Sequence, residues 1–469
     1  MKYRKEHDTM GEVNVPADKY WGAQTQRSYQ NFPIGQGREP MPAEIIRALA
    51  ILKSACAKAN ATLKPDKMTS DKANIICKVA DEICSGTLDG NFPLVVWQTG
   101  SGTQSNMNIN EVIAGRGNEI ARCRNILSND GTNDKLLHPN DDVNMSQSSN
   151  DTFPTAMNMA AVIAVEEQLL PAVESICGTL QQLMNDNQGV IKCGRTHLQD
   201  ATPISFSQEI SGWKYSLELD ADCIRKAIEP LRALAIGGTA VGTGLNAPAG
   251  FGEAVAEHIA ELTGHEFTSC PNKFHALSSK SEFVYAHGAI KALATDLMKI
   301  ANDIRWMASG PRNGLGEITI PANEPGSSIM PGKVNPTQCE QVTMVAAQVL
   351  GNDTTIGFAA SQGNFELNVF MPVIAYNFLQ SVRLLSESIT SFNERCVSGI
   401  KPNTEVMKED LSQSLMLVTA LSPHIGYENA ARIAKYANEH NSTLKAAALE
   451  LGLVSEEDFD KIVDPSKMI

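Results

Sequence analysis

One run of apolar residues constrains the fold of this chain more than any other feature of its sequence. Between residues 283 and 307 the apolar positions step by three and four without exception. They are Phe283, Ala286, Ile290, Leu293, Leu297, Ile300, Ile304 and Met307. A 3.5-residue repeat sustained over this length predicts one long helix, roughly 37 Å at 1.5 Å per residue, packed lengthwise against other helices.

Similar spacing elsewhere predicts a bundle. Helical intervals run from Pro42 to about Leu63, from Asp71 to about Cys84 and from Glu366 to about Phe392. Hydrophobic residues make up 42% of the 469 residues but aromatic residues only 6%, a composition that favours helices over sheets. A bundle of this length usually exceeds what one chain covers, so we expect an oligomer that pools its helices.

The predicted fold is therefore all-α, with a long central helix bundle and smaller N- and C-terminal helical domains. We place a mainly helical N-terminal domain at residues 1–147, the bundle at 148–398 and a small helical domain at 399–469. The stretch 399–403, which contains Gly and Pro, marks the last boundary.

Charge and cysteine usage exclude several classes of protein. The formal net charge of −14 argues against a nucleic-acid binder, which should carry a basic stripe. The ten cysteines form no CxxC pair and no zinc-type spacing, so we expect reduced thiols, no metal and a cytoplasmic protein. The N-terminus lacks the apolar stretch of a signal peptide, and no window approaches the length of a membrane span.

Residues 326–340 join a flexible loop to the start of a helix. Asn335 is a good N-cap, and Pro336 suits the first helical position, where its missing N–H costs nothing. Glycines at 326 and 332 permit backbone angles that other residues avoid. The simplest interpretation is a surface turn that leads into an ordinary helix.

The same segment also carries the groups that acid–base chemistry needs. Ser327 and Ser328 stand beside Lys333, and Glu340 lies in the first helical turns. Because a lysine and a helix N-terminus attract anions, the segment suits a carboxylate substrate.

Three further polar stretches are candidates, at residues 98–110, 138–151 and 194–203. In the second stretch, His138 with its neighbouring aspartates resembles a metal-ligand set, although a polar turn that caps the next helix is the simpler interpretation. In the third, His197 is crowded by polar residues and precedes a helix, which makes a catalytic and a structural role about equally plausible.

The segment GSSIMPGKVNPTQCE at 326–340 closely resembles the signature of the fumarase/aspartase superfamily of lyases, and the class II, iron-independent fumarases in particular. The segments VWQTGSGTQSNMN, HPNDDVN, SQSSND, GRTHLQDATP, IANDIRWMASGP and GNFELNVF look like fumarase segments too, so the resemblance covers nearly the whole chain. It implies a homotetramer whose active sites combine regions of three chains. It also implies reversible hydration of fumarate to L-malate, by trans addition of water through a carbanion (aci-carboxylate) intermediate and without a cofactor.

The resemblance also implies roles for individual residues. Ser327 would take the carbon proton, and Lys333 and Asn335 would hold the carboxylate on which charge accumulates. His197, with Glu340 as its charge partner, would handle the water. The implied substrate-binding residues are Ser101, Gly102, Thr103, Ser148, Ser149, Asn150, Thr196, Ser328 and Val334. A second dicarboxylate site would comprise His138, Pro139, Asn140 and Asp141, with Lys135 nearby where the family carries an arginine.

Three alternatives stay open. An aspartate ammonia-lyase of the same superfamily is the nearest, although Gly332 and the run 337–339 favour a fumarase. An inactive helical scaffold would keep the fold without the chemistry. A nicotinamide dehydrogenase rests only on the GxGxxA pattern at 242–247, which follows helical sequence where a strand is required.

Overall fold

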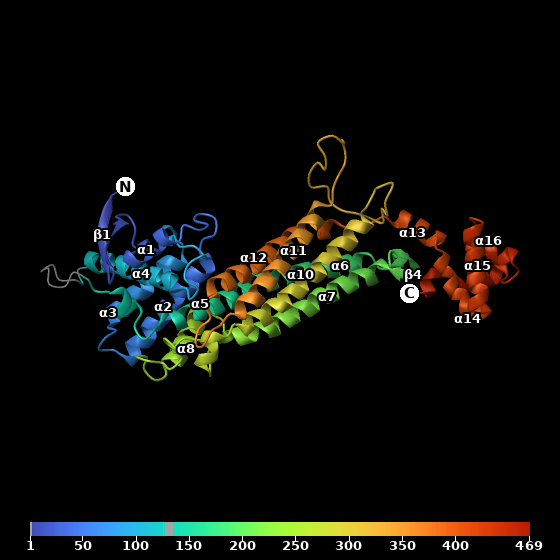
Figure 1. Cartoon of the computed structure of the whole chain (residues 1–469). Coiled ribbons are helices and arrows are strands. Elements are labelled where there is room, and N and C mark those ends of the chain that lie inside the picture. Colours follow the sequence, from blue (N-terminus) through green and yellow to red (C-terminus); the bar gives the residue numbers. More distant parts are fainter. Residues whose placement is uncertain (1, 125, 127–134) are drawn as a thin grey trace. The chain divides into compact units, whose positions relative to one another are not determined.

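The computed structural model describes residues 2–124, 126 and 135–469, and helices dominate these residues (Figure 1). The helices are α1 (Ala23–Asn31), α2 (Ala43–Leu63), α3 (Ser70–Cys84), α4 (Thr103–Cys123), α5 (Ser149–Ala164), α6 (Leu170–Asp186), α7 (Phe206–Ile228), α8 (Phe251–Thr263), α9 (Lys273–Ser278), α10 (Ser281–Met307), α11 (Thr337–Ala360), α12 (Met371–Arg395), α13 (Thr404–Gln413), α14 (Ser422–Ile425), α15 (Tyr427–Glu439), α16 (Leu444–Glu450) and α17 (Glu456–Ile462). The all-α prediction is confirmed.

The strands are short and pair two by two among the described residues. They are β1 (Tyr3–Asp8), β2 (Gly11–Pro16), β3 (Ile191–Thr196), β4 (Gln199–Ser205), β5 (Ala233–Leu234), β6 (Thr268–Ser269), β7 (Ile318–Thr319) and β8 (Lys401–Pro402). Residues 1–40 also contain regular structure. The β1–β2 hairpin and helix α1 lie there.

Packing divides the chain into two compact units. Unit 1 comprises Met1–Pro171, Asp222–Ala292 and Ala347–Leu385, and unit 2 comprises Ala172–Ala221, Leu293–Ala346 and Ser386–Ile469. Each unit draws on separate stretches of chain, so this division follows packing and not chain order. The three sequence domains stay a prediction, and the first of them includes residues 1, 125 and 127–134, which lie outside the described part.

Helix α10 carries the stripe that the sequence predicted. The eight apolar residues of the stripe are each at most 4% exposed. In unit 1 the start of α10 packs against α12, where the rings of Phe283 and Phe378 meet edge to face at 5.3 Å. On the next turn, His287 lies 3.0 Å from the Asp353 carboxylate of α11. A 3.5-residue repeat thus buries one face of the helix, as its period requires.

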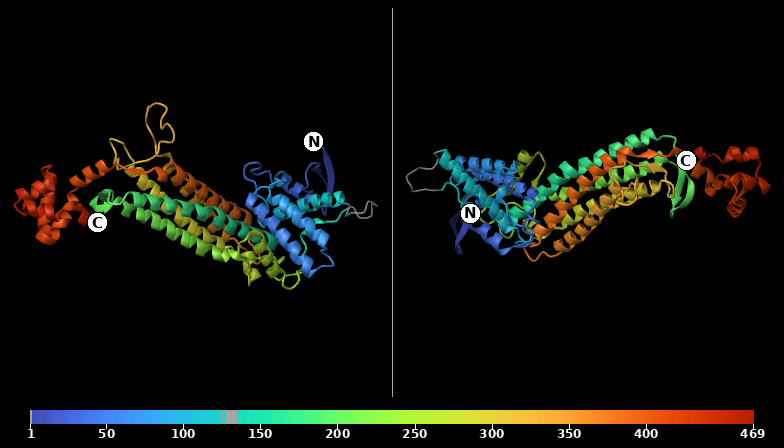
Figure 2. Two further views of the ribbon diagram at one scale, coloured as in Figure 1. Left: turned by 180° about the vertical axis from the view of Figure 1, so that it is seen from behind. Right: turned by 90° about the horizontal axis from the view of Figure 1, so that it is seen from above.

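Unit 2 contains the other halves of the long helices, which also lie side by side (Figures 1 and 2). The Trp213 indole of α7 donates to Asp303 of α10 at 3.1 Å. Helix α12 is linked to α11 through Ser388 and to α6 through Asn393. Polar contacts of this kind fix the register of helices whose apolar faces would pack in several ways.

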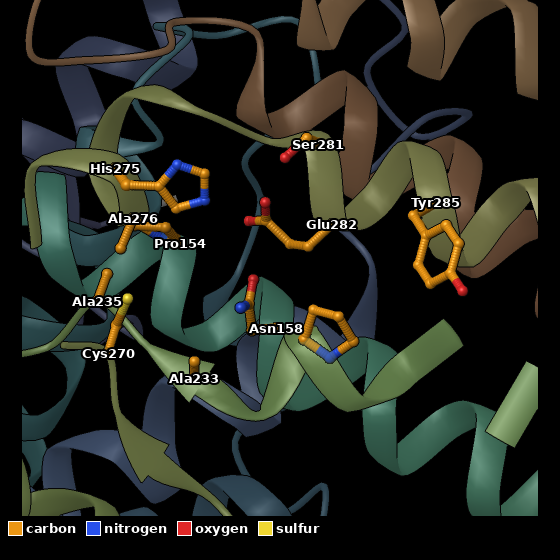
Figure 3. Close-up of a pocket in the computed structure, with 11 residues that line it drawn as sticks. Pro154, Asn158, Ala233, Ala235, Cys270, His275, Ala276, Ser281, Glu282 and Tyr285 are labelled. Carbon is orange, nitrogen blue, oxygen red and sulfur yellow. The ribbon is translucent and has the colours of Figure 1, made fainter. Parts of the chain in front are cut away.

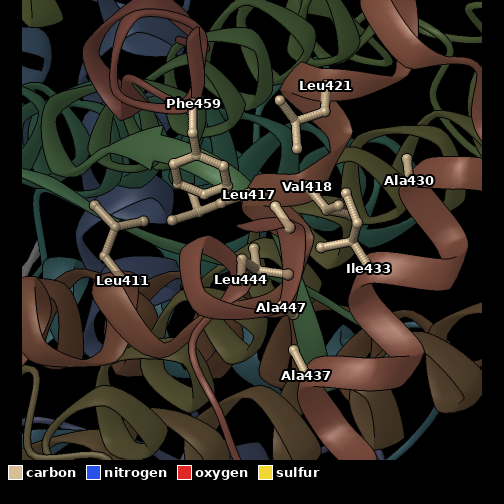
Figure 4. Close-up of a cluster of buried hydrophobic side chains, with 11 residues drawn as sticks. Leu411, Leu417, Val418, Leu421, Ala430, Ile433, Ala437, Leu444, Ala447 and Phe459 are labelled. Atoms are coloured by element: carbon tan, nitrogen blue, oxygen red, sulfur yellow. The ribbon is translucent and has the colours of Figure 1, made fainter. Parts of the chain in front are cut away.

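The C-terminal helices of unit 2 close around a small apolar core (Figure 4). Phe459 of α17 packs there with side chains from the four helices α13–α16 and the connecting 3₁₀ turn Leu415–Leu421. The buried members are Leu411, Leu417, Val418, Leu421, Ala430, Ile433, Ala437, Leu444, Ala447, Ala448 and Phe459. Within the described ranges, no helix is both long and apolar enough to cross a membrane.

Candidate active site

In unit 1 the first polar stretch forms the start of helix α4. Gly102 precedes the helix with a φ of 73°, which favours glycine, and a Cβ there would lie 2.1 Å from the Phe153 ring. The Ser101 and Thr103 hydroxyls lie 2.8 Å apart, and Thr103 is also 2.8 Å from the Ser149 hydroxyl. The structure therefore brings two of the predicted polar stretches together in one row of hydroxyls.

The second stretch reaches this row through the start of helix α5. Ser148 is the N-cap, and it forms a capping box with Asp151: each side chain accepts a backbone N–H from the other end of the first turn. The Asn150 side chain donates to the Ala240 carbonyl at 2.8 Å. Ser148, Ser149 and Asn150 are thus held on a rigid helix start.

Asp151 fastens this helix start to a distant loop. Its carboxylate accepts the backbone N–H groups of Gly237 and Thr239, at 3.1 and 2.8 Å, as well as that of Ser148. The side chain is fully buried, and burial raises its pKa to about 6. Sequence reasoning missed Asp151, although the pattern Ser-x-x-Asp ahead of an apolar helix is a capping-box signal.

A buried lysine contacts the segment that precedes helix α5. Lys53 of α2 is 0% exposed, and its Nζ donates to the side chains of Asn144 and Gln147 at 3.0 and 2.8 Å. Burial lowers the pKa of Lys53 to about 7, which places its titration near neutral pH. No sequence signal distinguishes it, because a lysine within a helical repeat usually lies on the solvent face.

The proposed second dicarboxylate site is an exposed turn. His138 caps the short π-helical turn Pro139–Val143, and its Nδ1 accepts the N–H groups of Asn140 and Asp141. The side chains of His138 and Asp141 are 53% and 83% exposed. The described residues contain no group of three or more His, Cys, Asp or Glu side chains placed to hold a metal ion.

In unit 2 the third polar stretch is a β-hairpin and not a helix end. Strands β3 and β4 pair antiparallel, and Thr196 pairs with Gln199 across a two-residue turn. The turn residues His197 and Leu198 have φ of 58° and 59°, as a type I′ turn requires. His197 and Thr196 are both exposed at this tip. Helical periodicity does not detect such a turn, which was therefore not predicted.

Buried charges hold the base of this hairpin. Lys192 is 2% exposed and forms ion pairs with Glu209 at 3.0 Å and with Glu317 at 3.3 Å. The other oxygen of Glu317, a fully buried side chain, accepts from Arg195 at 2.6 Å. The two cations of β3 thus pair with carboxylates that lie outside the hairpin. These ion pairs fix the orientation of the hairpin relative to the helices of unit 2.

The 326–340 segment forms a loop ahead of helix α11. Ser327 is half-buried, and its Oγ accepts the backbone N–H groups of Ile329 and Met330 at 3.2 and 3.1 Å. The N–H of Gly326 donates to the Lys333 carbonyl at 2.7 Å, which closes the loop at its base. The side chains of Ser328 and Lys333 are exposed, as is that of Val334.

The role predicted for Asn335 as an N-cap was wrong. Helix α11 begins at Thr337, and the Asn335 amide donates to the Gly326 carbonyl at 2.7 Å. The asparagine thus stabilises the loop, since its side chain is used across the loop and cannot cap the helix. Glu340 lies exposed in the first turn of α11.

The candidate residues of unit 2 lie on two separate segments, the β3–β4 hairpin and the 326–340 loop that leads into α11. Among the described residues, no hydrogen bond or ion pair links His197 to Ser327, Lys333 or Glu340. Each feature offers part of an anion site: the loop has an ammonium group and a supported hydroxyl, and the hairpin has an imidazole. Unit 1 separately offers its row of hydroxyls.

Comparison with known proteins defines the class first. The family described as "Lyase" matches residues 11–351, and the one described as "Fumarase C C-terminus" matches residues 417–469. By these matches the chain is a lyase.

Full-length relatives then define the family. A fumarate hydratase class II from Bacillus cereus is 62% identical over 469 residues, which cover 100% of this chain and 99% of the relative. The corresponding Bacillus subtilis protein is 61% identical with the same coverage. The crystal structure of class II fumarase from Schistosoma mansoni matches with a TM-score of 0.95 at 42% identity, over 100% of this chain and 99% of that one. The chain belongs to the class II fumarate hydratase family, and the resemblance predicted from its motifs is confirmed.

Proposed function

We propose that this protein interconverts fumarate and L-malate by trans addition and removal of water. The observation that carries the proposal is the 62% identity to a class II fumarate hydratase along the entire chain. The chemical difficulty is the removal of a proton from the carbon next to an ionised carboxylate, which places further negative charge on that carboxylate. The site must supply a base, an acid and preorganised donors where this charge develops.

In this proposal Ser327 is the base that takes the carbon proton. A serine hydroxyl is a weak base until its oxyanion is stabilised. The N–H groups of Ile329 and Met330, which already point at Ser327 Oγ, would supply that stabilisation. Lys333 and Asn335 would hold the carboxylate on which the charge accumulates. The hydrogen bond from the Asn335 amide to the Gly326 carbonyl supports this role, because it restrains the side chain.

His197 would handle the water, with Glu340 as its charge partner. An exposed imidazole on a rigid two-residue turn is free to meet a substrate from outside its own hairpin. The remaining residues would bind the substrate carboxylates through hydroxyls, amides and backbone N–H groups. They are Ser101, Gly102, Thr103, Ser148, Ser149, Asn150, Thr196, Ser328 and Val334.

We further propose that the chain assembles as a homotetramer whose active sites combine three chains. Helices of both units expose large apolar side chains that a monomer leaves in water. In unit 2 they include Tyr215 and Met344, each 67% exposed, and in unit 1 Tyr285 and Phe358, at 60% and 66%. The second dicarboxylate site at His138–Asp141 and a cytoplasmic location also belong to the proposal.

Activity assays test the chemistry. Fumarate absorbance in the ultraviolet should rise with L-malate and stay constant with L-aspartate. Ser327→Ala and His197→Asn should each lower turnover by at least about a hundredfold. Ser412→Ala and His424→Asn, which alter exposed residues of the same types in the C-terminal part, should not change turnover. If Ser327→Ala or His197→Asn turned over as fast as the wild type, the catalytic role assigned to that residue would be wrong.

Subunit mixing tests the shared site. The Ser327→Ala and His197→Asn proteins, unfolded and refolded together, should regain activity, because about a quarter of the sites would then receive both wild-type residues from different chains. Ser327→Ala mixed with Lys333→Ala is the matched control. Both changes lie in one loop of one chain, so no site could be restored. Equal activity in the two mixtures, or a monomer in sedimentation, would contradict the assembly.

A further inference from the structure

Unit 1 contains a cavity whose lining includes none of the proposed catalytic or substrate-binding residues (Figure 3). Its volume is about 440 Å³, and its walls come from α5, α9, the start of α10 and the segment around β5. Part of the wall is apolar, formed by Pro154, Pro230, Ala233, Ala235 and Ala276. None of the lining residues belongs to the proposed fumarate site.

Two acceptor oxygens in the cavity wall have no partner. Asn158 is 5% exposed, and its Nδ2 donates to the Leu231 carbonyl at 3.0 Å, which fixes the orientation of the amide. Its Oδ1 is buried and has no hydrogen-bond partner among the residues that the structure describes. The same is true of Glu282 Oε2. A buried acceptor without a hydrogen bond costs free energy of folding. A bound donor between the two oxygens would remove that cost.

The two groups face the same space. In Figure 3 the Asn158 amide oxygen points toward the Glu282 carboxylate, although they come from different helices. Two acceptors cannot satisfy each other, and a donor between them would serve both. The nearby Lys280 Nζ donates to the carbonyls of Ala276 and Ser279, both at 2.6 Å, and neither acceptor oxygen has it as a hydrogen-bond partner.

From this arrangement we propose that the cavity binds a small primary amine in its ammonium form. The ammonium group would lie between Asn158 Oδ1 and Glu282 Oε2, since it carries three donors and a charge that complements the carboxylate. The alkyl part of the ligand would contact the proline and alanine wall. The exposed His275 also lines the cavity.

The test uses n-butylammonium chloride as the probe and n-butanol as its uncharged counterpart. Binding to the full-length protein is measured by calorimetry and by saturation-transfer NMR. Butylammonium should bind saturably, and butanol should bind at least about tenfold more weakly, because it lacks the charge-assisted bond. Equal binding of the two probes would mean an ordinary apolar cavity and would overturn the proposal.

Variants locate the site. Glu282→Gln removes the charge with little change in shape and should weaken butylammonium binding at least about tenfold. Glu257→Gln, an exposed glutamate on α8 outside the cavity, should bind as the wild type does. Ala233→Leu should abolish binding by filling the cavity while both acceptors remain. Absence of saturable binding to the wild type, or undiminished binding to Glu282→Gln or Ala233→Leu, would refute the amine site. None of these outcomes depends on fumarate hydration.

Discussion

The substitution Asp220→Asn should make the protein more stable at alkaline pH, with an effect that shrinks as the pH falls toward 4. Asp220 lies on α7 and is 6% exposed, and its Oδ2 has no hydrogen-bond partner within the described ranges. Burial raises the pKa of Asp220 to about 7, with a smaller contribution from the neighbouring Asp296 carboxyl of α10. Two carboxyl groups in such a place can share one proton but cannot both ionise cheaply.

The sign and size of the effect follow from the pKa. Because the pKa is raised in the folded state from 3.8 to about 7, the protonated form stabilises the fold below pH 3.8. That contribution is lost progressively as the pH rises from 3.8 to about 7. At 1.36 kcal/mol per pH unit, the loss amounts to about 4 kcal/mol at most. Asparagine is neutral at every pH and has nearly the shape of the protonated acid, so the variant should avoid this loss.

The assay is thermal and denaturant unfolding of wild type and variant at pH 5 and at pH 8.5, at one protein concentration. We expect a higher unfolding midpoint for Asp220→Asn at both pH values, with a difference at pH 5 that is less than half of the difference at pH 8.5. Asp186→Asn is the matched control, because Asp186 is exposed on α6 and its substitution should not change the midpoint at either pH. A variant that is no more stable than wild type at pH 8.5, or whose stabilisation does not grow between pH 5 and pH 8.5, would refute the reasoning.

Two further substitutions test the supports of the candidate site. Gly102→Ala should lower the melting temperature and raise KM for malate, because the new Cβ would lie 2.1 Å from the Phe153 ring on a backbone with positive φ, at a cost of about 1–3 kcal/mol. Gly178→Ala, in a helix with open space around it, should be neutral or slightly stabilising. Glu317→Ala should destabilise the protein by about 3–5 kcal/mol, because it removes a fully buried carboxylate from Lys192 and the neighbouring guanidinium. If denaturant unfolding showed wild-type stability for Gly102→Ala, the close approach of position 102 to the Phe153 ring would be contradicted. The same result for Glu317→Ala would contradict the stabilising role of the buried carboxylate.

Local geometry explains which features the sequence could predict. The apolar stripe of α10 was found because a helix buries every third or fourth residue whatever its partner is. The limits of α2 and α3 followed from the same period. The motif at 326–340 led to the family because it is long and specific. The helical interval from Glu366 began too early, since α12 starts at Met371.

Tertiary structure decided the rest, because it depends on contacts between residues far apart in the chain. The Thr103 hydroxyl meets Ser149 across 46 positions, and Arg195 meets Glu317 across 122. Neither separation has a periodic signature. The cost of ionising Asp151 likewise depends on which loop covers it. The sequence by itself thus determined the longest apolar-striped helices, the family and the types of reactive group. Only the fold decided which charges are buried, which hydroxyls meet and where His197 is presented, because burial and long-range pairing set those energies.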